Sequence, residues 1–308
     1  MSKRVAVMDL GTNTFHLLIA SGTAHNYQEI VHLHESVKLG EGGINKGYIL
    51  PEAFARGINT MLQFQQQIEA NGVEQVRAIA TSALRSASNG NDFINEVKAK
   101  TGISIEIIDG AQEAEFIYNG VRLCGCLSGG SSLIMDIGGG SVEFILGNAD
   151  HIIYKQSFEI GAARLMDLFH RTDPIPAASI QALNLYLEDK LSDLFKAVTN
   201  HKVEVLIGSS GAFETFAGLI EIEKGEEFDL KKNVSYTFNE TELLTLTNQL
   251  VQSTHQKRAG NKAIIPVRVD MIVVASLITR FIMHKLQIGN VMMCTNSLKE
   301  GVLAGMLD

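Results

Sequence analysis

The chain of 308 residues is 45% hydrophobic and 19% charged, which is the balance of a globular protein rather than of a disordered one. This length exceeds what a single hydrophobic core usually fills, so we expect two domains. The formal net charge of -8 argues against a nucleic-acid-binding protein, which carries a basic surface, and any anionic ligand must be met by a local group of cations.

The first part of the chain predicts alternating strands and helices. The segment VAVMDLGTNTFHLLIA, residues 5–20, is an apolar strand, an aspartate, a glycine-containing turn and a second apolar strand. A third strand is expected near residues 29–39. Pro51 fits the first turn of a helix, where its missing N–H costs nothing, and apolar side chains then recur at helical spacing. Further strands are expected at 76–80 and 103–108, and helices at 92–100 and 111–123.

The second part of the chain repeats the opening pattern. Residues 133–147 read LIMDIGGGSVEFILG, so Asp136 matches Asp9 at a distance of 127 residues. A spacing this long is unlike a solenoid repeat and indicates a duplicated domain. Two α/β halves led by related hairpins predict a ligand site in a cleft between them. The remaining elements are expected to be strands at 152–156, 203–207 and 291–293, helices at 163–169, 178–198, 241–251, 270–285 and 298–307, a helix opened by Gly211, and a polar surface excursion over 221–239.

The first glycine turn combines groups that bind phosphate. Gly11 permits backbone angles closed to other residues, and successive N–H groups in such a turn form an anion nest. Thr12, Asn13 and Thr14 add side-chain donors, and Asp9 stands where it can hold a metal ion or its water shell. The alternative is an ordinary hairpin with aspartate and glycine in turn positions.

The second glycine turn strengthens the phosphate interpretation. Consecutive glycines separate its two apolar strands: Gly138, Gly139 and Gly140. Their cost in chain entropy indicates that the backbone must approach something closely. Ser141 adds a hydroxyl, and Glu143 lies two residues beyond it on the same face. Asp136 and Glu143 are therefore expected to share a Mg²⁺ ion, and two such loops predict a phosphate clamp.

Other polar residues have both a functional and a structural interpretation. Glu113, in the first turn of an expected helix, suits a general base that deprotonates water, or a carboxylate favoured by the helix dipole. The sequence GSSG at 208–211 opens a helix and is either an anion site or a tight turn. His32 and His34 point to one side of a strand, where surface or core histidine is favoured over a metal site. Four cations are candidate phosphate ligands or solvated surface residues: Lys38, Arg85, Arg164 and Arg268.

The cysteines and the apolar segments bear on the compartment. Cys124, Cys126 and Cys294 are too few and odd in number for a disulfide framework, which favours a reducing compartment. Cys124 and Cys126 have no second ligand pair in sequence, so small residues at a helix end are favoured over a metal site. No signal peptide is expected, and no uncharged run approaches the roughly 18 residues that cross a bilayer. We therefore expect a cytoplasmic protein without a membrane partner.

Seven short blocks lie in order along nearly the whole chain: DLGTNTFH at 9–16, LGEG at 39–42, ATSALR at 80–85, GAQEA at 110–114, DIGGGSVE at 136–143, GAARL at 161–165 and KEG at 299–301. Taken together and in this order, they resemble the exopolyphosphatase and guanosine pentaphosphate phosphatase (Ppx/GppA) family of the actin, sugar kinase and heat-shock ATPase superfamily. Lys38 and Lys299 stand where that family more usually has arginine, and Cys294 where serine is common.

The resemblance implies an α/β, actin-like ATPase (ribonuclease H-like) fold. Duplicated domains at 1–124 and 125–297 are expected to flank the cleft, with a closing helix at 298–308 packed on the first. Glu113 is the implied base, Asp136 and Glu143 hold Mg²⁺ with help from Asp9, and both glycine loops and Arg85 bind the terminal phosphate. The implied reaction is Mg²⁺-assisted attack of water on the terminal phosphate of polyphosphate or guanosine pentaphosphate, and a homodimer is one assembly that the family allows.

Two other functions stay open at this point. One is an actin-like kinase or ATPase that uses a nucleotide as donor, for which the GSSG sequence at 208–211 is only a partial nucleotide-binding loop. The other is a sensor that binds guanosine tetra- or pentaphosphate without hydrolysing it. A catalytic glutamate combined with metal-site acids counts against a sensor, because binding alone needs no general base.

Overall fold

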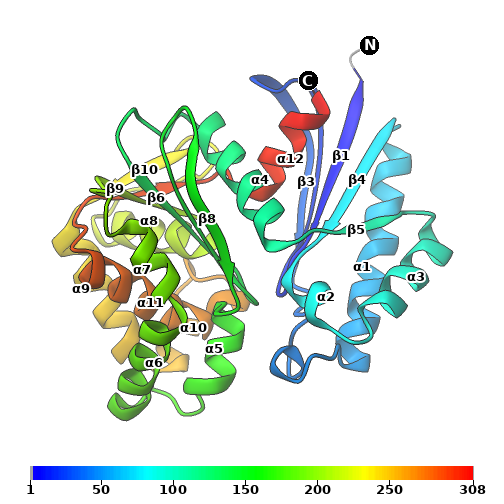
Figure 1. Cartoon of the computed structure of the whole chain (residues 1–308). Helices are drawn as coiled ribbons and strands as arrows, with labels where there is room; N and C mark the ends of the chain where they lie inside the picture. The colour runs from blue at the N-terminus through cyan, green and yellow to red at the C-terminus, as the bar shows by residue number, and fades with distance from the viewer. Residues whose placement is uncertain (1–2, 308) are drawn as a thin grey trace. The chain divides into compact units, whose positions relative to one another are not determined.

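The chain forms two compact units in the computed structural model, which describes residues 3–307 (Figure 1). Unit 1 comprises the described residues up to Gly120 together with those from Leu298 onward, and unit 2 comprises Val121–Ser297. Within residues 3–307, no helix combines the length and the apolar character that crossing a membrane requires.

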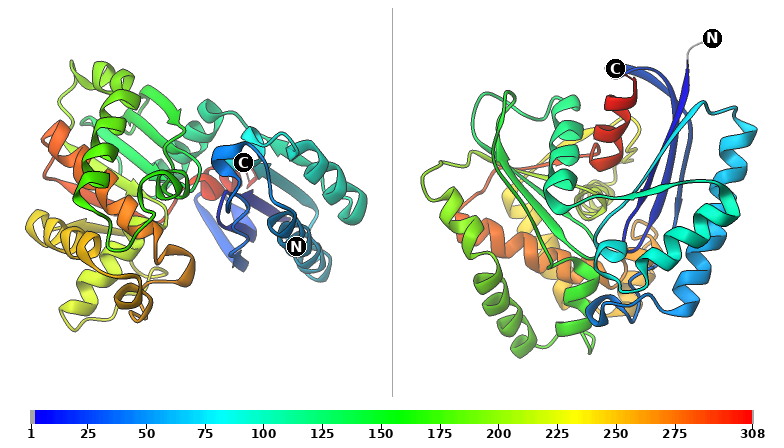
Figure 2. Two further views of the ribbon diagram at one scale, coloured as in Figure 1. Left: turned by 90° about the horizontal axis from the view of Figure 1, so that it is seen from below. Right: turned by 45° about the vertical axis from the view of Figure 1, so that its right-hand side comes forward.

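Unit 1 is built on a five-stranded sheet in the order β3-β2-β1-β4-β5. β1 pairs antiparallel with β2 and parallel with β4, so the sheet is mixed. Helices α1 and α3 cover one face and α12 packs against β1 and β2 on the other (Figure 2). The elements are β1 (Arg4–Leu10), β2 (Phe15–Thr23), β3 (Asn26–Glu35), η1 (Ile44–Lys46), α1 (Pro51–Ala70), β4 (Gln75–Ala80), α2 (Ser82–Ser86), α3 (Gly90–Thr101), β5 (Ile105–Ile107), α4 (Gly110–Leu123) and α12 (Leu298–Leu307).

Unit 2 is built on a six-stranded sheet in the order β10-β11-β9-β6-β7-β8. Its central strand β6 is buried along its whole length, which is why its sequence is a continuous apolar run up to Asp136. The elements are β6 (Ser132–Ile137), β7 (Val142–Gly147), β8 (Ile152–Phe158), α5 (Ala162–Phe169), α6 (Ala177–Lys190), α7 (Ser192–Val198), β9 (Val205–Ser209), α8 (Gly211–Glu223), β10 (Ser235–Phe238), α9 (Glu240–Gln252), α10 (His255–Ala259), η2 (Pro266–Arg268), α11 (Met271–Leu286) and β11 (Val291–Cys294).

The two sheets repeat one topology, which confirms the duplicated α/β fold. The strand order β3-β2-β1-β4-β5 of unit 1 recurs as β8-β7-β6-β9-β11 in unit 2, and β10 adds one edge strand. The repeat extends to the register of the leading hairpins. Asp9 lies opposite His16, and Asp136 lies opposite Glu143, again 127 residues later. This mixed order, with two antiparallel and two parallel neighbours, is that of the ribonuclease H-like domain expected for an actin-like protein.

The structure corrects three of the expected elements. The third strand ends at Glu35 rather than near residue 39, because Lys38 adopts a left-handed φ of 50° and its N–H bonds to the carbonyl oxygen of Asn13. The helix expected over 178–198 is two helices that meet at Leu191; Leu187, Leu191 and Leu194 are all buried, so the apolar spacing continues across the break and conceals it. The expected surface excursion over 221–239 contains the edge strand β10.

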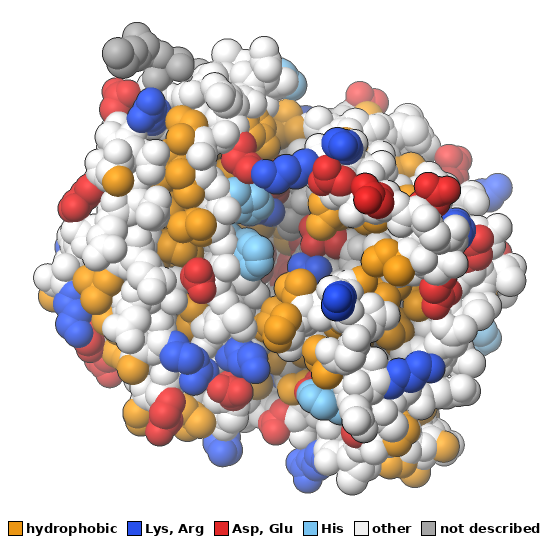
Figure 3. All heavy atoms as spheres, turned by 180° about the vertical axis from the view of Figure 1, so that it is seen from behind, with side chains coloured by type: hydrophobic (Ala, Val, Ile, Leu, Met, Phe, Trp, Pro, Cys, Tyr) orange, Lys and Arg blue, Asp and Glu red, His pale blue; other side chains and the backbone are white. Residues whose placement is uncertain are grey.

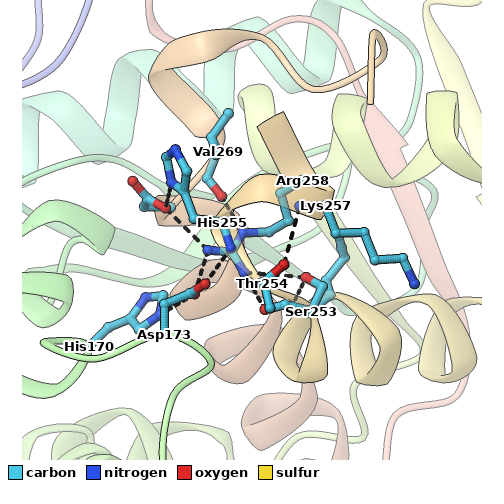
Figure 4. A network of polar contacts seen from close by, with 10 residues as sticks. His170, Asp173, Ser253, Thr254, His255, Lys257, Arg258 and Val269 are labelled. Atoms are coloured by element: carbon cyan, nitrogen blue, oxygen red, sulfur yellow. Dashed lines mark hydrogen bonds and ion pairs between the residues drawn. The ribbon is translucent and has the colours of Figure 1, made fainter. Parts of the chain in front are cut away.

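A buried arginine ties three surface segments of unit 2 together (Figure 4). Arg258 is 1% exposed, and its Nε donates to the carbonyl oxygen of Val269 at 2.6 Å. Its Nη1 donates to the carbonyl oxygen of Ser253 at 2.6 Å, and its Nη2 donates to Oδ1 of Asp173 at 2.7 Å and of Asp270 at 3.1 Å. A charge this deeply buried is tolerated because its donors are matched by acceptors.

Candidate active site

The first glycine turn is held by its own backbone and by the segment that follows β3. The N–H of Gly11 donates to the carbonyl oxygen of Thr14 at 3.1 Å, and a Cβ at position 11 would come within 3.0 Å of that same oxygen. The N–H of Gly40 donates to the carbonyl oxygen of Thr12 at 3.0 Å. Together with the bond from Lys38 to Asn13, these contacts fix the turn before any ligand binds.

The predicted base lies where the sequence indicated, in the first turn of α4. Asp109 caps this helix: its Oδ1 accepts from the N–H groups of Ala111 at 2.9 Å and Gln112 at 2.8 Å. Glu113 is 6% exposed, and its Oε2 accepts a hydrogen bond from Nη1 of Arg85 at 2.9 Å. The same Nη1 also donates to the carbonyl oxygen of Ile108 at 3.1 Å. The structure thus joins two residues that the sequence assigned to separate roles.

In unit 2, two buried carboxylates lie side by side on one face of the sheet. Asp136 and Glu143 are directly opposite in the antiparallel β6–β7 pair and are 6% and 2% exposed. Directly opposite residues place their side chains on the same face, with Cβ atoms about 5 Å apart. Oδ2 of Asp136 accepts hydrogen bonds from the hydroxyls of Ser209, at 2.7 Å, and Ser297. Oε1 of Glu143 accepts one from Ser157 at 2.6 Å.

This donor set fits the expected magnesium ion. Mg²⁺ prefers hard oxygen ligands and is usually held by one or two carboxylates while it keeps several of its waters. Asp136 and Glu143 supply two carboxylates in register, and the serine hydroxyls around them orient those carboxylates as outer partners of a metal site commonly do. Asp9, the third expected acid, belongs to unit 1.

The second glycine loop is closely packed by the start of α5. A Cβ at Gly161 would lie 2.4 Å from backbone atoms of Gly139, so the two backbones are in direct contact. The N–H of Gly161 donates to the carbonyl oxygen of Gly140 at 3.2 Å, and the N–H of Ala162 to that of Gly138 at 2.9 Å. The close backbone approach that the glycines indicated is therefore, at least in part, an approach of this helix.

The four candidate cations have different surroundings. Arg85 is bonded to Glu113, and Arg164 donates from Nε to the carbonyl oxygen of Gly140 at 3.1 Å while also pairing with Glu159. Arg268 lies against Gly211 and donates to Glu214 and Thr215, both at 3.1 Å, at the start of α8. Lys38 contacts the first turn through its backbone, whose N–H donates to the carbonyl oxygen of Asn13. On the face seen in Figure 3, basic and acidic side chains are interspersed, so cations gather only locally there.

Sequence reasoning missed the serines that hold the carboxylates. Ser209 lies in the GSSG sequence, but its hydroxyl donates to Asp136 rather than marking an anion site at a helix N-terminus. A signal existed for Ser297: the polar run Thr295-Asn296-Ser297 directly follows the apolar strand β11. Since β6, β9 and β11 are parallel neighbours, polar residues at their carboxyl ends meet at one edge of the sheet.

Comparisons with known protein sequences identify related proteins. A model of the Ppx/GppA phosphatase family matches residues 18–308. A protein of Haemophilus influenzae provisionally described as an exopolyphosphatase is 28% identical over 304 residues, which cover 98% of this chain and 90% of that protein. A guanosine-5'-triphosphate,3'-diphosphate pyrophosphatase of Aliivibrio fischeri is 25% identical over 310 residues, and this chain spans 60% of its length.

Solved structures show the same architecture. The crystal structure of an exopolyphosphatase from Cytophaga hutchinsonii superposes with a TM-score of 0.96 at 41% identity, covering 99% of this chain and 98% of that one. A Ppx/GppA family member from Aquifex aeolicus superposes with a TM-score of 0.83 at 23% identity, covering 100% of this chain and 98% of that one, which supports the fold alone.

Proposed function

Because the chain belongs to the Ppx/GppA phosphatase family, we propose that it releases the terminal phosphate of inorganic polyphosphate by hydrolysis. The choice of polyphosphate is supported by the 41% identity to an exopolyphosphatase over nearly the full length of both chains. Guanosine pentaphosphate is the second candidate substrate, supported by the relative from Aliivibrio fischeri. Both molecules end in the same chemical group, a phosphate joined through a phosphoanhydride.

The proposed reaction rests on one observation, the buried carboxylate of Glu113 paired with Arg85. The ion pair with Arg85 favours the ionised form of this buried carboxylate, and a hydrolase needs an ionised base within reach of the attacking water. In the reaction, Glu113 takes a proton from the water, whose oxygen bonds to the terminal phosphorus. The bridging phosphorus–oxygen bond breaks, and the shortened chain leaves with that oxygen and its electron pair.

The glycine turns and the acidic pair supply the binding and charge stabilisation. The carbonyl oxygens of Gly138 and Gly140 accept hydrogen bonds from the start of α5, which holds the loop in place. Phosphate needs donors, and the loop supplies them as N–H groups and the hydroxyl of Ser141. In the first turn the N–H of Gly11 bonds to Thr14, so Gly11 shapes the turn while Thr12, Asn13 and Thr14 supply the donors. Asp136 and Glu143 would hold Mg²⁺, which when bound neutralises charge on the phosphate oxygens. Arg85 orients Glu113, and its guanidinium brings a positive charge to the phosphate site.

The kinase alternative loses its main sequence support. Ser209 bonds to Asp136, and a Cβ at Gly208 would enter the ring of Phe213, only 2.1 Å from its nearest atom. The guanidinium of Arg268 lies against Gly211, where a Cβ would approach it to 1.9 Å. The glycines of the GSSG sequence therefore have a packing explanation that involves no nucleotide.

The proposed function is tested by measuring phosphate release. The purified chain is incubated with polyphosphate of several lengths and with guanosine pentaphosphate, each with Mg²⁺ and with a chelator, in the absence of nucleotide. We expect Mg²⁺-dependent release of orthophosphate from polyphosphate, with substrate shortened one residue at a time. Binding of guanosine pentaphosphate without any release would instead support the sensor, and activity that appears only after a nucleotide is added would support the kinase.

A further inference from the structure

Three cysteines from two distant stretches of the chain converge in unit 2. The Sγ atoms of Cys124, Cys126 and Cys294 all lie within 4.8 Å of one another. Cys124 and Cys126 follow the end of α4, and Gly125 between them takes a left-handed φ of 75° that bends the chain back. Cys294 is the last residue of β11. The sequence offered only two neighbouring thiols, and the fold adds the third.

We propose that Cys124, Cys126 and Cys294 bind one thiophilic metal ion of the d¹⁰ class, Zn²⁺ or Cu⁺. Thiolate sulfur selects these soft or borderline ions over Mg²⁺. A central ion with metal–sulfur bonds of about 2.3 Å in a trigonal arrangement places the sulfurs about 4 Å apart, which the observed spacing permits. This site is separate from the proposed Mg²⁺ site in both ligand chemistry and residues.

The three thiols form a largely buried site that solvent reaches from one side. Cys294 is fully buried, whereas Cys124 and Cys126 are partly exposed, so an ion has a path of entry. Within residues 3–307, the cluster contains no histidine, aspartate or glutamate as a fourth member. Three sulfurs alone complete a trigonal Cu⁺ site, and a Zn²⁺ ion would add a water molecule.

Metal ions bind cysteine as the thiolate, so binding at this cluster releases protons and the affinity is expected to rise with pH.

The position of the cluster gives the ion a mechanical consequence. The chain passes from unit 1 into unit 2 after Gly120 and returns after Ser297. Cys124 and Cys126 therefore lie just after the first passage, and Cys294 just before the second. A bound ion would tie these two connecting segments to each other. Ser297, which donates to Asp136, is three residues beyond Cys294, so the ion would also restrain the segment that carries this hydrogen bond to the acidic pair.

Metal titration of the full chain tests the proposal. Reduced, metal-free protein is titrated anaerobically with Zn²⁺ and, separately, with Cu⁺ against chromophoric chelators, and with Cd²⁺ to record thiolate charge-transfer absorption. We expect the chain to bind one equivalent of Zn²⁺, of Cu⁺ or of each. Each single change of Cys124→Ser, Cys126→Ser or Cys294→Ser is expected to weaken binding at least about 100-fold. The control Thr295→Val, next to Cys294 but not a thiol, should bind like the native chain.

A second measurement covers variants that fold poorly. On the native chain, a bound ion should slow alkylation of the partly exposed Cys124 and Cys126, and it should reduce hydrogen exchange over 121–126 and 291–297. The proposal is overturned if neither ion binds the native chain more tightly than it binds the Cys124→Ser/Cys126→Ser variant. It is also overturned if the cysteines are alkylated at the same rate in the presence of either ion as in its absence. Neither outcome depends on phosphatase activity, so this test is independent of the proposed function.

Discussion

Nη1 of Arg85 and Oε2 of Glu113 lie 2.9 Å apart in an ion pair whose side chains are 21% and 8% exposed. The two residues come from α2 and α4, 28 positions apart in the chain. An arginine that was expected to bind phosphate is thus bonded to the carboxylate that was expected to activate water. The guanidinium of Arg85 thus orients the proposed base and places a positive charge beside it.

Removal of Arg85 is expected to destabilise unit 1. Arg85→Met removes the arginine from a buried ion pair, and we expect the free energy of unfolding to fall by about 3 kcal/mol. Adding Glu113→Gln should recover part of that loss, because the buried negative charge that Arg85 balanced is then gone. Urea denaturation of the single and double variants measures both effects.

The matched control is Lys100→Met in the exposed pair with Glu96, which should cost less than about 1 kcal/mol. Equal losses for Arg85→Met and Lys100→Met would contradict the structural role of the buried pair.

Loss of one carboxylate from the acidic pair is expected to remove the response to Mg²⁺. Asp136→Asn keeps the shape of the side chain but removes the charge that would hold the ion, and activity should fall more than about 100-fold. Initial rates are measured over a range of Mg²⁺ concentrations. Asp150→Asn, an exposed aspartate in the turn before β8, serves as the control and should follow the native curve. An Asp136→Asn variant with the native Mg²⁺ dependence would remove this residue from the metal site.

The contact between Gly161 and the second glycine loop predicts a sharp steric effect. Gly161→Ala places a Cβ 2.4 Å from the backbone of Gly139, so the loop or α5 must shift. A shift of about 1 Å at a site that positions phosphate reduces kcat/KM about 100-fold. The matched control is Gly129→Ala, where a Cβ meets nothing within 4 Å. The packing argument fails if both variants retain native kcat/KM.

The sequence predicted the features that depend on neighbouring residues. The leading hairpins, the aspartate at the end of each first strand and the helix that carries Glu113 all follow from apolar spacing and glycine position. The partners of these residues could not be predicted, because sheet order and register decide them. Ser209 and Ser297 reach Asp136 from 73 and 161 positions away. That both glycine loops engage one substrate molecule stays a prediction.

The network around Arg258 predicts an acid-dependent stability of unit 2. Partial burial raises the pKa of Asp173, but hydrogen bonds from Arg258, from the N–H of His255 and from His170 together lower it below the usual 3.8. A lowered pKa in the folded state stabilises the protein above pH 3.8, and this contribution disappears as the pH falls through the folded value.

Asp173→Asn tests this linkage. Near neutral pH the variant should unfold with a free energy lower by about 1–3 kcal/mol, because a charged acceptor for Arg258 is lost. As the pH falls below 3.8 the difference from the native chain should shrink toward zero. Denaturation at a series of pH values measures it, with the exposed Asp189→Asn as a control that should show little difference at any pH. A difference that stays constant through the acid range would contradict the sign of the shift.

The most direct measurement compares turnover with binding in Glu113→Gln. The amide keeps the size of the side chain but cannot accept a proton from water, so phosphate release from polyphosphate should fall about 10²- to 10⁴-fold. Polyphosphate affinity, measured by calorimetry on the same preparation, should stay within a few-fold of native. The control Glu115→Gln, on the exposed side of α4, should keep both phosphate release and polyphosphate affinity within a few-fold of native. Near-native phosphate release by Glu113→Gln would show that this carboxylate is not the base and would contradict the proposed reaction.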